Sequence, residues 1–143
     1  MTKGLITAAL MLSATIVGAQ EPRPYTEGPV VNVSYIKIKP GMFDAYMKWL
    51  ATERKALMDE YKKAGLILDS RVYTTEARGP GDPDLILSVT YKNWAALDGL
   101  DDRQDAVGAK VVGSRDKANQ ASISREAMRE VLGSQTIQEM VLK

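Results

Sequence analysis

The chain of 143 residues contains no histidine and no cysteine. These two absences exclude serine–histidine and cysteine–histidine nucleophiles, disulfides, zinc fingers, iron–sulfur clusters and histidine-ligated haem. An excess of either charge is also missing, with 19 Lys and Arg against 18 Asp and Glu, so no basic field attracts nucleic acid. We therefore expect no metal, no cofactor and no nucleic-acid partner.

What remains is ordinary globular composition, 45% apolar and 26% charged. The chain is too short for two full-sized domains and too apolar to be disordered. At this length roughly two thirds of the unfolded surface can be buried, which is enough for one hydrophobic core.

The first 19 residues have the layout of a secretory signal peptide. Lys3 supplies a positive start, an uncharged and mostly apolar stretch runs from Leu5 to Val17, and Gly18-Ala19 offers small residues for signal peptidase. The stretch is shorter than the ~20 apolar residues that a membrane-spanning helix needs. We expect cleavage after Ala19, no stable membrane insertion afterwards, and an exported protein, periplasmic or secreted.

The remaining residues alternate between strand and helix patterns. Residues 20–29 hold three prolines and predict an extended, loosely held arm. Runs of β-branched residues predict strands, and apolar residues at helical spacing predict helices. The expected order is strand 30–39, helix 42–64 capped by Gly65, strands 66–75 and 84–91, a short helix capped by Asn93, a helical region 102–132 broken near 122–124 and ended by Gly133, and strand 135–142.

This order predicts one α+β domain over residues 30–143 with the ferredoxin-like βαββαβ arrangement. In that arrangement a four-stranded antiparallel sheet has helices on one face. Leu85 and Leu87 point to one face and Ile86 to the other, so both faces carry apolar side chains. Because no element is left to cover the second face, we expect a homodimer whose sheets pack face to face.

Two segments resemble dimeric α/β-barrel proteins, of which the antibiotic-biosynthesis-monooxygenase-like branch is best known. Ile36-Lys37-Ile38-Lys39-Pro40-Gly41-Met42-Phe43 is similar to the passage from their first strand into the first helix. Thr90-Tyr91-Lys92-Asn93-Trp94-Ala95-Ala96-Leu97 is similar to the exit of their third strand. The resemblance covers about residues 30–142 and implies a dimeric barrel with a ligand pocket between helices and sheet. Many members carry a histidine where this chain has Leu97-Asp98-Gly99-Leu100, so histidine-assisted members are poor guides.

Three candidate site residues share one face of the second expected strand: Asp69, Arg71 and Tyr73. Alternate residues of a strand lie about 7 Å apart on the same face. Such a group could polarise a bound molecule, with Tyr73 as proton donor, or Asp69 and Arg71 could form a structural ion pair. We assign them as ligand-binding candidates and assign no catalytic residue.

Arg54 is the fourth ligand-binding candidate. It lies in the middle of the apolar face of the expected 42–64 helix, flanked by Leu50, Leu57, Met58 and Tyr61. A buried guanidinium keeps its charge, so it requires a carboxylate or an anionic ligand, unless its long stem reaches solvent. Asp69 and Glu139 are the candidate internal carboxylates.

A narrow stripe of small side chains lies on one side of the 102–132 region: Val107, Val111, Ser114, Ala118 and Ala121. Small side chains either let neighbouring elements approach closely or leave a cavity between them.

Three functions follow from these patterns. The first is an exported homodimeric protein with a non-catalytic binding or structural role in the cell envelope, with a small molecule as its ligand. The second is a cofactor-independent monooxygenase-like enzyme acting on a small aromatic or carbonyl compound in a helix–sheet pocket, because Tyr, Asp, Glu, Lys and Arg can transfer protons. The third is an accessory domain that docks onto another envelope protein through residues 20–29. The lack of histidine and cysteine favours the first.

Overall fold

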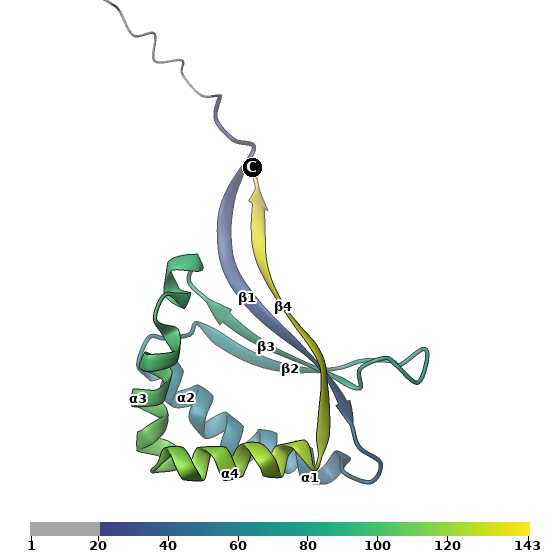
Figure 1. Cartoon of the computed structure of the whole chain (residues 1–143). Helices are drawn as coiled ribbons and strands as arrows, with labels where there is room; N and C mark the ends of the chain where they lie inside the picture. Colours follow the sequence, from purple (N-terminus) through teal and green to yellow (C-terminus); the bar gives the residue numbers. More distant parts are fainter. Residues whose placement is uncertain (1–20) are drawn as a thin grey trace, which may run out of the picture.

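Four antiparallel strands form one sheet with helices on one side (Figure 1). The computed structural model describes residues 21–143, with the backbone alone at position 115, and the expected signal peptide lies outside these residues. The strand order is β2-β3-β1-β4, the order of a ferredoxin-like βαββαβ fold, as the sequence predicts. The elements are β1 (Tyr25–Ile38), α1 (Phe43–Trp49), the π-helix η1 (Leu50–Arg54), α2 (Lys55–Lys63), β2 (Asp69–Thr74), β3 (Leu85–Tyr91), the 3-10 helix η2 (Trp94–Leu97), α3 (Leu100–Val112), α4 (Arg115–Glu126) and β4 (Arg129–Leu142).

The helix expected over 42–64 is confirmed, but it contains a turn of π-helix. α1, η1 and α2 follow one another without a break between Phe43 and Lys63. Gly65 ends the helix at φ +70, and the next amide, of Leu66, donates to the carbonyl of Tyr61 at 2.9 Å. The extra residue of the π-turn, Leu50–Arg54, rotates α2 relative to α1, which periodicity at 3.6 residues per turn does not predict.

The second helical region differs from its prediction. It breaks at Gly113, which has φ +88, and restarts at Ser114, whose hydroxyl accepts the amide of Lys117 at 3.2 Å. The predicted break near residues 122–124 is wrong, because a glycine in the left-handed region followed by a serine cap ends one helix and begins the next. Asn93 caps η2 as predicted, accepting the amide of Ala96 at 3.1 Å.

The last strand is longer than predicted. β4 begins at Arg129, so Gly133 lies inside the strand and does not end a helix. The register shifts from Tyr35 opposite Gly133 to Ile36 opposite Val131, and this bulge interrupts the alternation that would have revealed the strand.

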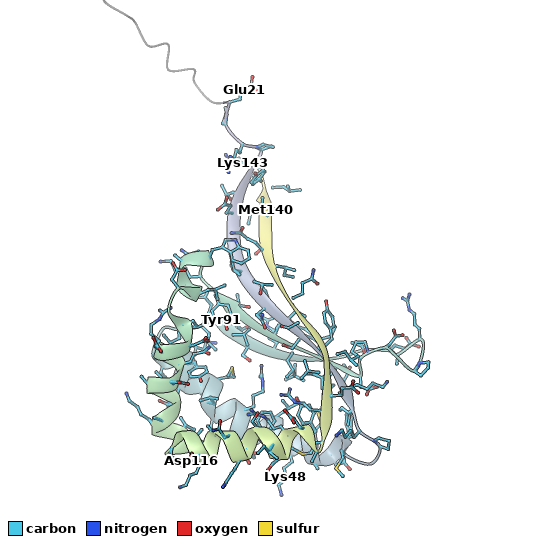
Figure 2. All side chains as sticks on the ribbon, viewed as in Figure 1. Glu21, Lys48, Tyr91, Asp116, Met140 and Lys143 are labelled. Carbon is cyan, nitrogen blue, oxygen red and sulfur yellow. The ribbon has the colours of Figure 1, made fainter. Side chains whose placement is uncertain are left out.

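The proline-rich segment is in part a strand. β1 begins at Tyr25, and residues 25–27 pair with residues 140–142 of β4, so the loosely held arm expected over 20–29 is wrong from Tyr25 onward. This ribbon extends past β3, which pairs with β1 only from Val30 (Figure 1). Figure 2 shows Met140 and Lys143 at its end.

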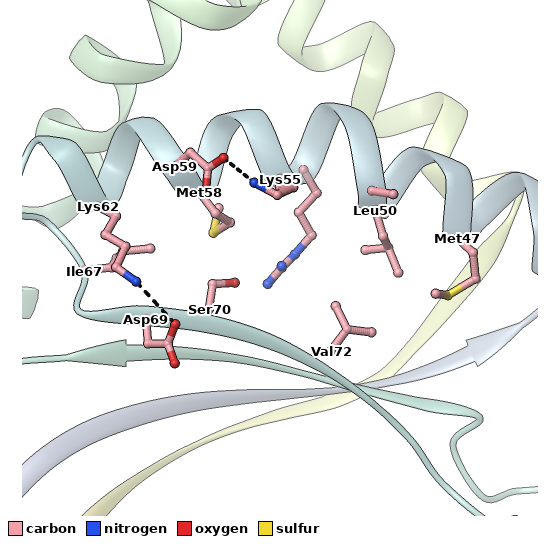
Figure 3. A pocket seen from close by; sticks show the side chains of 12 residues that line it. Met47, Leu50, Lys55, Met58, Asp59, Lys62, Ile67, Asp69, Ser70 and Val72 are labelled. Atoms are coloured by element: carbon pink, nitrogen blue, oxygen red, sulfur yellow. Dashed lines mark hydrogen bonds and ion pairs between the residues drawn. The ribbon is translucent and has the colours of Figure 1, made fainter.

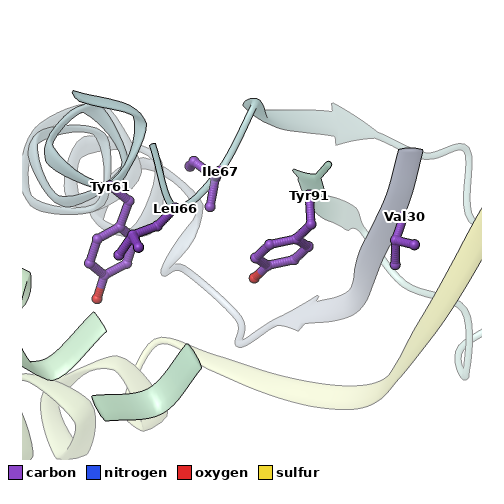
Figure 4. Packing of buried hydrophobic residues seen from close by; sticks show 5 residues of the cluster. All are labelled: Val30, Tyr61, Leu66, Ile67 and Tyr91. Carbon is purple, nitrogen blue, oxygen red and sulfur yellow. The ribbon is translucent and has the colours of Figure 1, made fainter. Parts of the chain in front are cut away.

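The core lies between the helices and one face of the sheet. Val30, Ile36 and Leu85 are fully buried there, and Leu87 nearly so. Val30 and Tyr91 pack with Tyr61, Leu66 and Ile67 at one end (Figure 4). At the other end Ile36, Leu85 and Leu87 pack with Tyr46 and Leu50.

The second face of the sheet has no helix over it. Register places Ile86, Ser88 and Thr90 of β3 beside Tyr73, Arg71 and Asp69 of β2, and beside Tyr35, Val33 and Val31 of β1. We call this the open face. The alternation predicted for β3 is confirmed, with Leu85 and Leu87 on the covered face.

Within residues 21–143 no helix is long and apolar enough to cross a membrane. The same residues contain no group of three or more acidic side chains placed to hold a metal ion.

Leu85→Ala tests the core. Because Leu85 is 0% exposed, we expect the variant to lose about 2–5 kcal/mol of unfolding free energy in urea titrations. Leu142→Ala, at a residue 79% exposed, is the control and should change stability by less than about 0.5 kcal/mol. Equal losses in both variants would contradict the assignment of the core.

Candidate functional site

Tyr46 lies where α1 meets the sheet. Its side chain is 0% exposed and packs with Ile36, Leu50, Leu85 and Leu87. One turn along, the ring of Trp49 stacks on it, with centroids 5.8 Å apart and planes 9° from parallel. The two rings therefore form a rigid aromatic wall at this end of the core.

Three arginines from different elements surround this wall. Arg129, the first residue of β4, donates from Nη1 to the Tyr46 hydroxyl at 2.9 Å and lies 5.6 Å from its ring centroid. Arg125, in the last turn of α4, lies 5.0 Å from the centroid of Trp49. Arg54 is the last residue of η1. We call Arg54, Arg125 and Arg129 the arginine cluster.

The pKa directions show that these charges interact. Burial raises the pKa of Tyr46, and the positive charges of all three arginines act in the opposite direction. Burial lowers the pKa of Arg54; the phenol of Tyr46 opposes this, and the charge of Arg129 adds to it. Burial also lowers the pKa of Arg125, with Arg129 adding to the effect. The guanidinium groups are thus partly desolvated and close enough to repel one another.

The arginine cluster has no paired carboxylate among residues 21–143. None of the ion pairs within these residues involves Arg54, Arg125 or Arg129. The Nε atoms of Arg125 and Arg129 are buried and have no hydrogen-bond partner. The charges of Glu53 and Glu126 oppose the lowering of the pKa of Arg125, but neither forms an ion pair with it, and the Glu53 carboxylate accepts the indole N–H of Trp49 at 2.9 Å. The cluster therefore carries positive charge and N–H donors that the described chain leaves unmatched.

Two cavities share Arg54 as a lining residue. The first, which we call the interhelical cavity, has a volume of about 660 Å³ and is lined by α1, η1 and α2 on one side and α3 and α4 on the other. The second, the helix–sheet cavity, has a volume of about 310 Å³ and lies between the first helix and β2. Arg54 thus lies between a cavity formed by helices alone and a cavity formed by a helix and the sheet.

The helix–sheet cavity is lined by charges that are already paired (Figure 3). Lys55 lies 2.6 Å from Asp59, and Lys62 lies 3.6 Å from Asp69. Ser70 and Val72 point from β2 toward the helix, and the Ser70 hydroxyl is buried with no hydrogen-bond partner.

The stripe of small side chains leaves a cavity. Val111, Ala118 and Ala121 line the interhelical cavity, whereas Val107 packs against the core. Because a valine or alanine cannot reach across to α2, the space between the two helical layers stays open.

The carboxylates predicted for Arg54 are wrong. Asp69 accepts the Arg71 Nε–H at 2.6 Å and also pairs with Lys62, so it is already compensated. Glu139 lines a depression on the open face, on the far side of the sheet from Arg54. The odd-numbered residues of β2 lie on the open face. The sequence predicts that they share a face but does not predict which face of the sheet this is.

The structure therefore separates the four predicted site residues. Asp69, Arg71 and Tyr73 line one depression of the open face, whereas Arg54 lies on the helix side of the sheet, where Asp69 alone of the three lines a cavity with it. The hydrogen bond from Arg71 lowers the pKa of Asp69, and Asp69 raises that of Arg71. This supports the structural ion pair over a substrate-polarising group.

Arg125, Arg129, Tyr46 and Trp49 were missed as site residues. Arg125 and Arg129 were read as part of one long helix, although Arg129 begins a strand. Helical spacing does not bring the two arginines together, because α4 ends at Glu126 before Arg129, so no local pattern indicates this site.

Comparison with known proteins supports the fold. No protein-family model matches the chain, and no curated protein matches it. HapK from Hahella chejuensis is 12% identical with a TM-score of 0.52, covering 77% of this chain and 91% of its own. A protein of Shewanella oneidensis is 14% identical with a TM-score of 0.49, covering 82% and 96%. A dimeric ferredoxin-like protein from an uncultured marine organism is 13% identical with a TM-score of 0.38, covering 82% and 96%.

The chain has a ferredoxin-like fold. At such identities the likeness extends to the fold and to nothing finer.

Arg54→Leu tests whether Arg54 has an internal counterion. Since no carboxylate pairs with it among residues 21–143, we expect the free energy of unfolding in urea to stay within about 0.5 kcal/mol of wild type or to rise. Lys55→Leu, at the exposed neighbour that pairs with Asp59, is the control for a leucine in this helix. A loss of about 3–5 kcal/mol in Arg54→Leu alone would reveal a stranded carboxylate.

Proposed function

We propose that this protein binds a small anionic molecule at the arginine cluster, in a non-catalytic role, as an exported homodimer. The observation that carries this proposal is the pair of buried Nε–H groups of Arg125 and Arg129 that have no acceptor. A buried donor without a partner costs about 1–3 kcal/mol, and more when it is charged. An anion would supply the counter-charge that the ion pairs among residues 21–143 do not give to these arginines.

The chemistry of the guanidinium group indicates which anions fit. Its planar fork matches the two oxygens of a carboxylate or phosphate, and such charge-assisted hydrogen bonds are about twice as strong as neutral ones. Arg54, Arg125 and Arg129 come from η1, α4 and β4, so a bound anion would also tie together elements far apart in sequence.

The carboxylates of the helix–sheet cavity favour binding over the monooxygenase-like alternative. Hydrogen bonding to Lys55 lowers the pKa of Asp59, and hydrogen bonding to Arg71 lowers that of Asp69. A general base works best with a pKa near the operating pH, so both carboxylates are poorly suited to proton transfer at neutral pH.

The export and the dimer rest on different observations. The layout of residues 1–19 supports export. The open face supports a homodimer, because Tyr73 and Ile137 are each 46% exposed there without a helix to cover them.

Inorganic phosphate should stabilise the protein saturably. At ten times the Kd the expected gain is about 1.4 kcal/mol, measured as a rise in Tm against chloride of equal ionic strength. Arg125→Gln should abolish the rise, whereas Arg78→Gln, at an exposed loop residue outside the cluster, should keep it. No saturable rise in wild type, or equal rises in both variants, would contradict the proposal.

Ile137→Glu tests the dimer. Ile137 lies opposite Val31 on the open face, so a charge there should convert a dimer into a monomer in light scattering at micromolar concentration. Ile123→Glu is the matched control, because Ile123 is 69% exposed on α4. A wild-type monomer, or a dimer that survives Ile137→Glu, would contradict face-to-face packing.

A further inference from the structure

We infer that the anion is the head of an amphipathic monocarboxylate whose apolar body occupies the interhelical cavity. This inference rests on the proposed function and names the chemical class of the ligand. It also distinguishes between the two cavities that share Arg54, since only one of them would hold the body of the ligand.

The interhelical cavity combines a charged end with apolar walls. Arg54 and Arg125 line it together with Lys117, against the single carboxylate of Glu53, a net charge of +2. The rest of the lining is mainly apolar and includes Leu57, Val111, Val112, Ala118 and Ala121. Ligand pockets typically combine mostly apolar walls with a few polar groups that fix orientation.

The size of the cavity fits a small organic molecule better than a bare ion. Its volume of about 660 Å³ lies within the range of about 300–1,000 Å³ that is usual for ligand pockets. A phosphate ion alone would leave the walls formed by α3 and α4 uncovered. An apolar chain or ring would fill this space and remove the apolar surface of both partners from water.

The helix–sheet cavity is the weaker alternative. It is about half as large, and the carboxylates of Asp59 and Asp69 neutralise Lys55 and Lys62 on its wall. An anion entering there would meet two carboxylates, whereas in the interhelical cavity it meets one, which Trp49 already engages.

Trp49 explains how the head of the ligand is oriented. The Arg125 guanidinium lies over the Trp49 ring, so its flat face is used by the indole and its N–H edge remains for an acceptor. Arg125 lines the interhelical cavity, so this edge is the part of its guanidinium that the head of the ligand would meet.

The test compares acetate, hexanoate and decanoate by calorimetry on the full chain and on two alanine-to-leucine variants. Each CH₂ buried contributes about 0.8 kcal/mol, or about fourfold in Kd, so the four extra CH₂ groups of decanoate, if fully buried, tighten binding about 250-fold over hexanoate; we expect a gain of at least about tenfold in wild type. Ala121→Leu fills the interhelical cavity and should remove this gain. Ala51→Leu is the matched control, because Ala51 lines the helix–sheet cavity only.

The outcomes separate this inference from the proposed function. If decanoate binds no more tightly than hexanoate while phosphate still stabilises the protein through Arg125, the inference is wrong and the proposed function stands. If Ala51→Leu removes the chain-length gain and Ala121→Leu keeps it, the body lies in the helix–sheet cavity and the inference is also wrong. If neither phosphate nor any carboxylate binds, both fail. Should a leucine variant fold poorly, Ala118→Leu replaces Ala121→Leu, since Ala118 lines the same cavity.

Discussion

The hydrogen bond between Tyr46 and Arg129 joins α1 to the first residue of β4. The rest of the site depends on this contact. Tyr46 is fully buried against the sheet, and its hydroxyl accepts from the first residue of β4 at 2.9 Å. A buried phenol needs a partner, and a guanidinium at this position supplies it. The same contact draws a positive charge to the edge of the core, next to Arg54 and Arg125. Packing therefore creates the arginine cluster, and the positive charge of the cluster is the basis of the proposed anion site.

A protein that requires charge only for solubility keeps it in water, and one that requires it for structure pairs it, as Asp69 and Arg71 are paired on the open face. The arginine cluster does neither: two of its Nε–H groups are buried without an acceptor. The interhelical cavity opens beside Arg54 and Arg125, so the unmatched charge and the open space coincide.

Much of the fold follows from the sequence, because periodicity and caps are local. The helix ended by Gly65, the cap at Asn93 and the alternation of β3 were all predicted, and together they define a ferredoxin-like order. The start of β4 was not predicted, because a bulge at Leu132 interrupts the alternation of apolar and polar residues there. Of the site, only Arg54 was recognised, since a charge on an apolar helix face is visible in sequence. Its neighbours Arg125 and Arg129 come from elements whose boundary was misplaced, and their approach to Tyr46 is a tertiary contact that no local pattern encodes.

The arginine Nε–H signals in ¹H–¹⁵N spectra, followed during a titration with inorganic phosphate, test the central claim most directly. We predict that the Nε–H signals of Arg125 and Arg129 shift together along one saturation curve, because neither group has an acceptor among residues 21–143. Arg103 is the internal reference, since its Nε–H already donates to the backbone carbonyl of Gly99 at 3.4 Å. Signals of Arg125 and Arg129 that stay fixed, or that drift no more than that of Arg103, would contradict it.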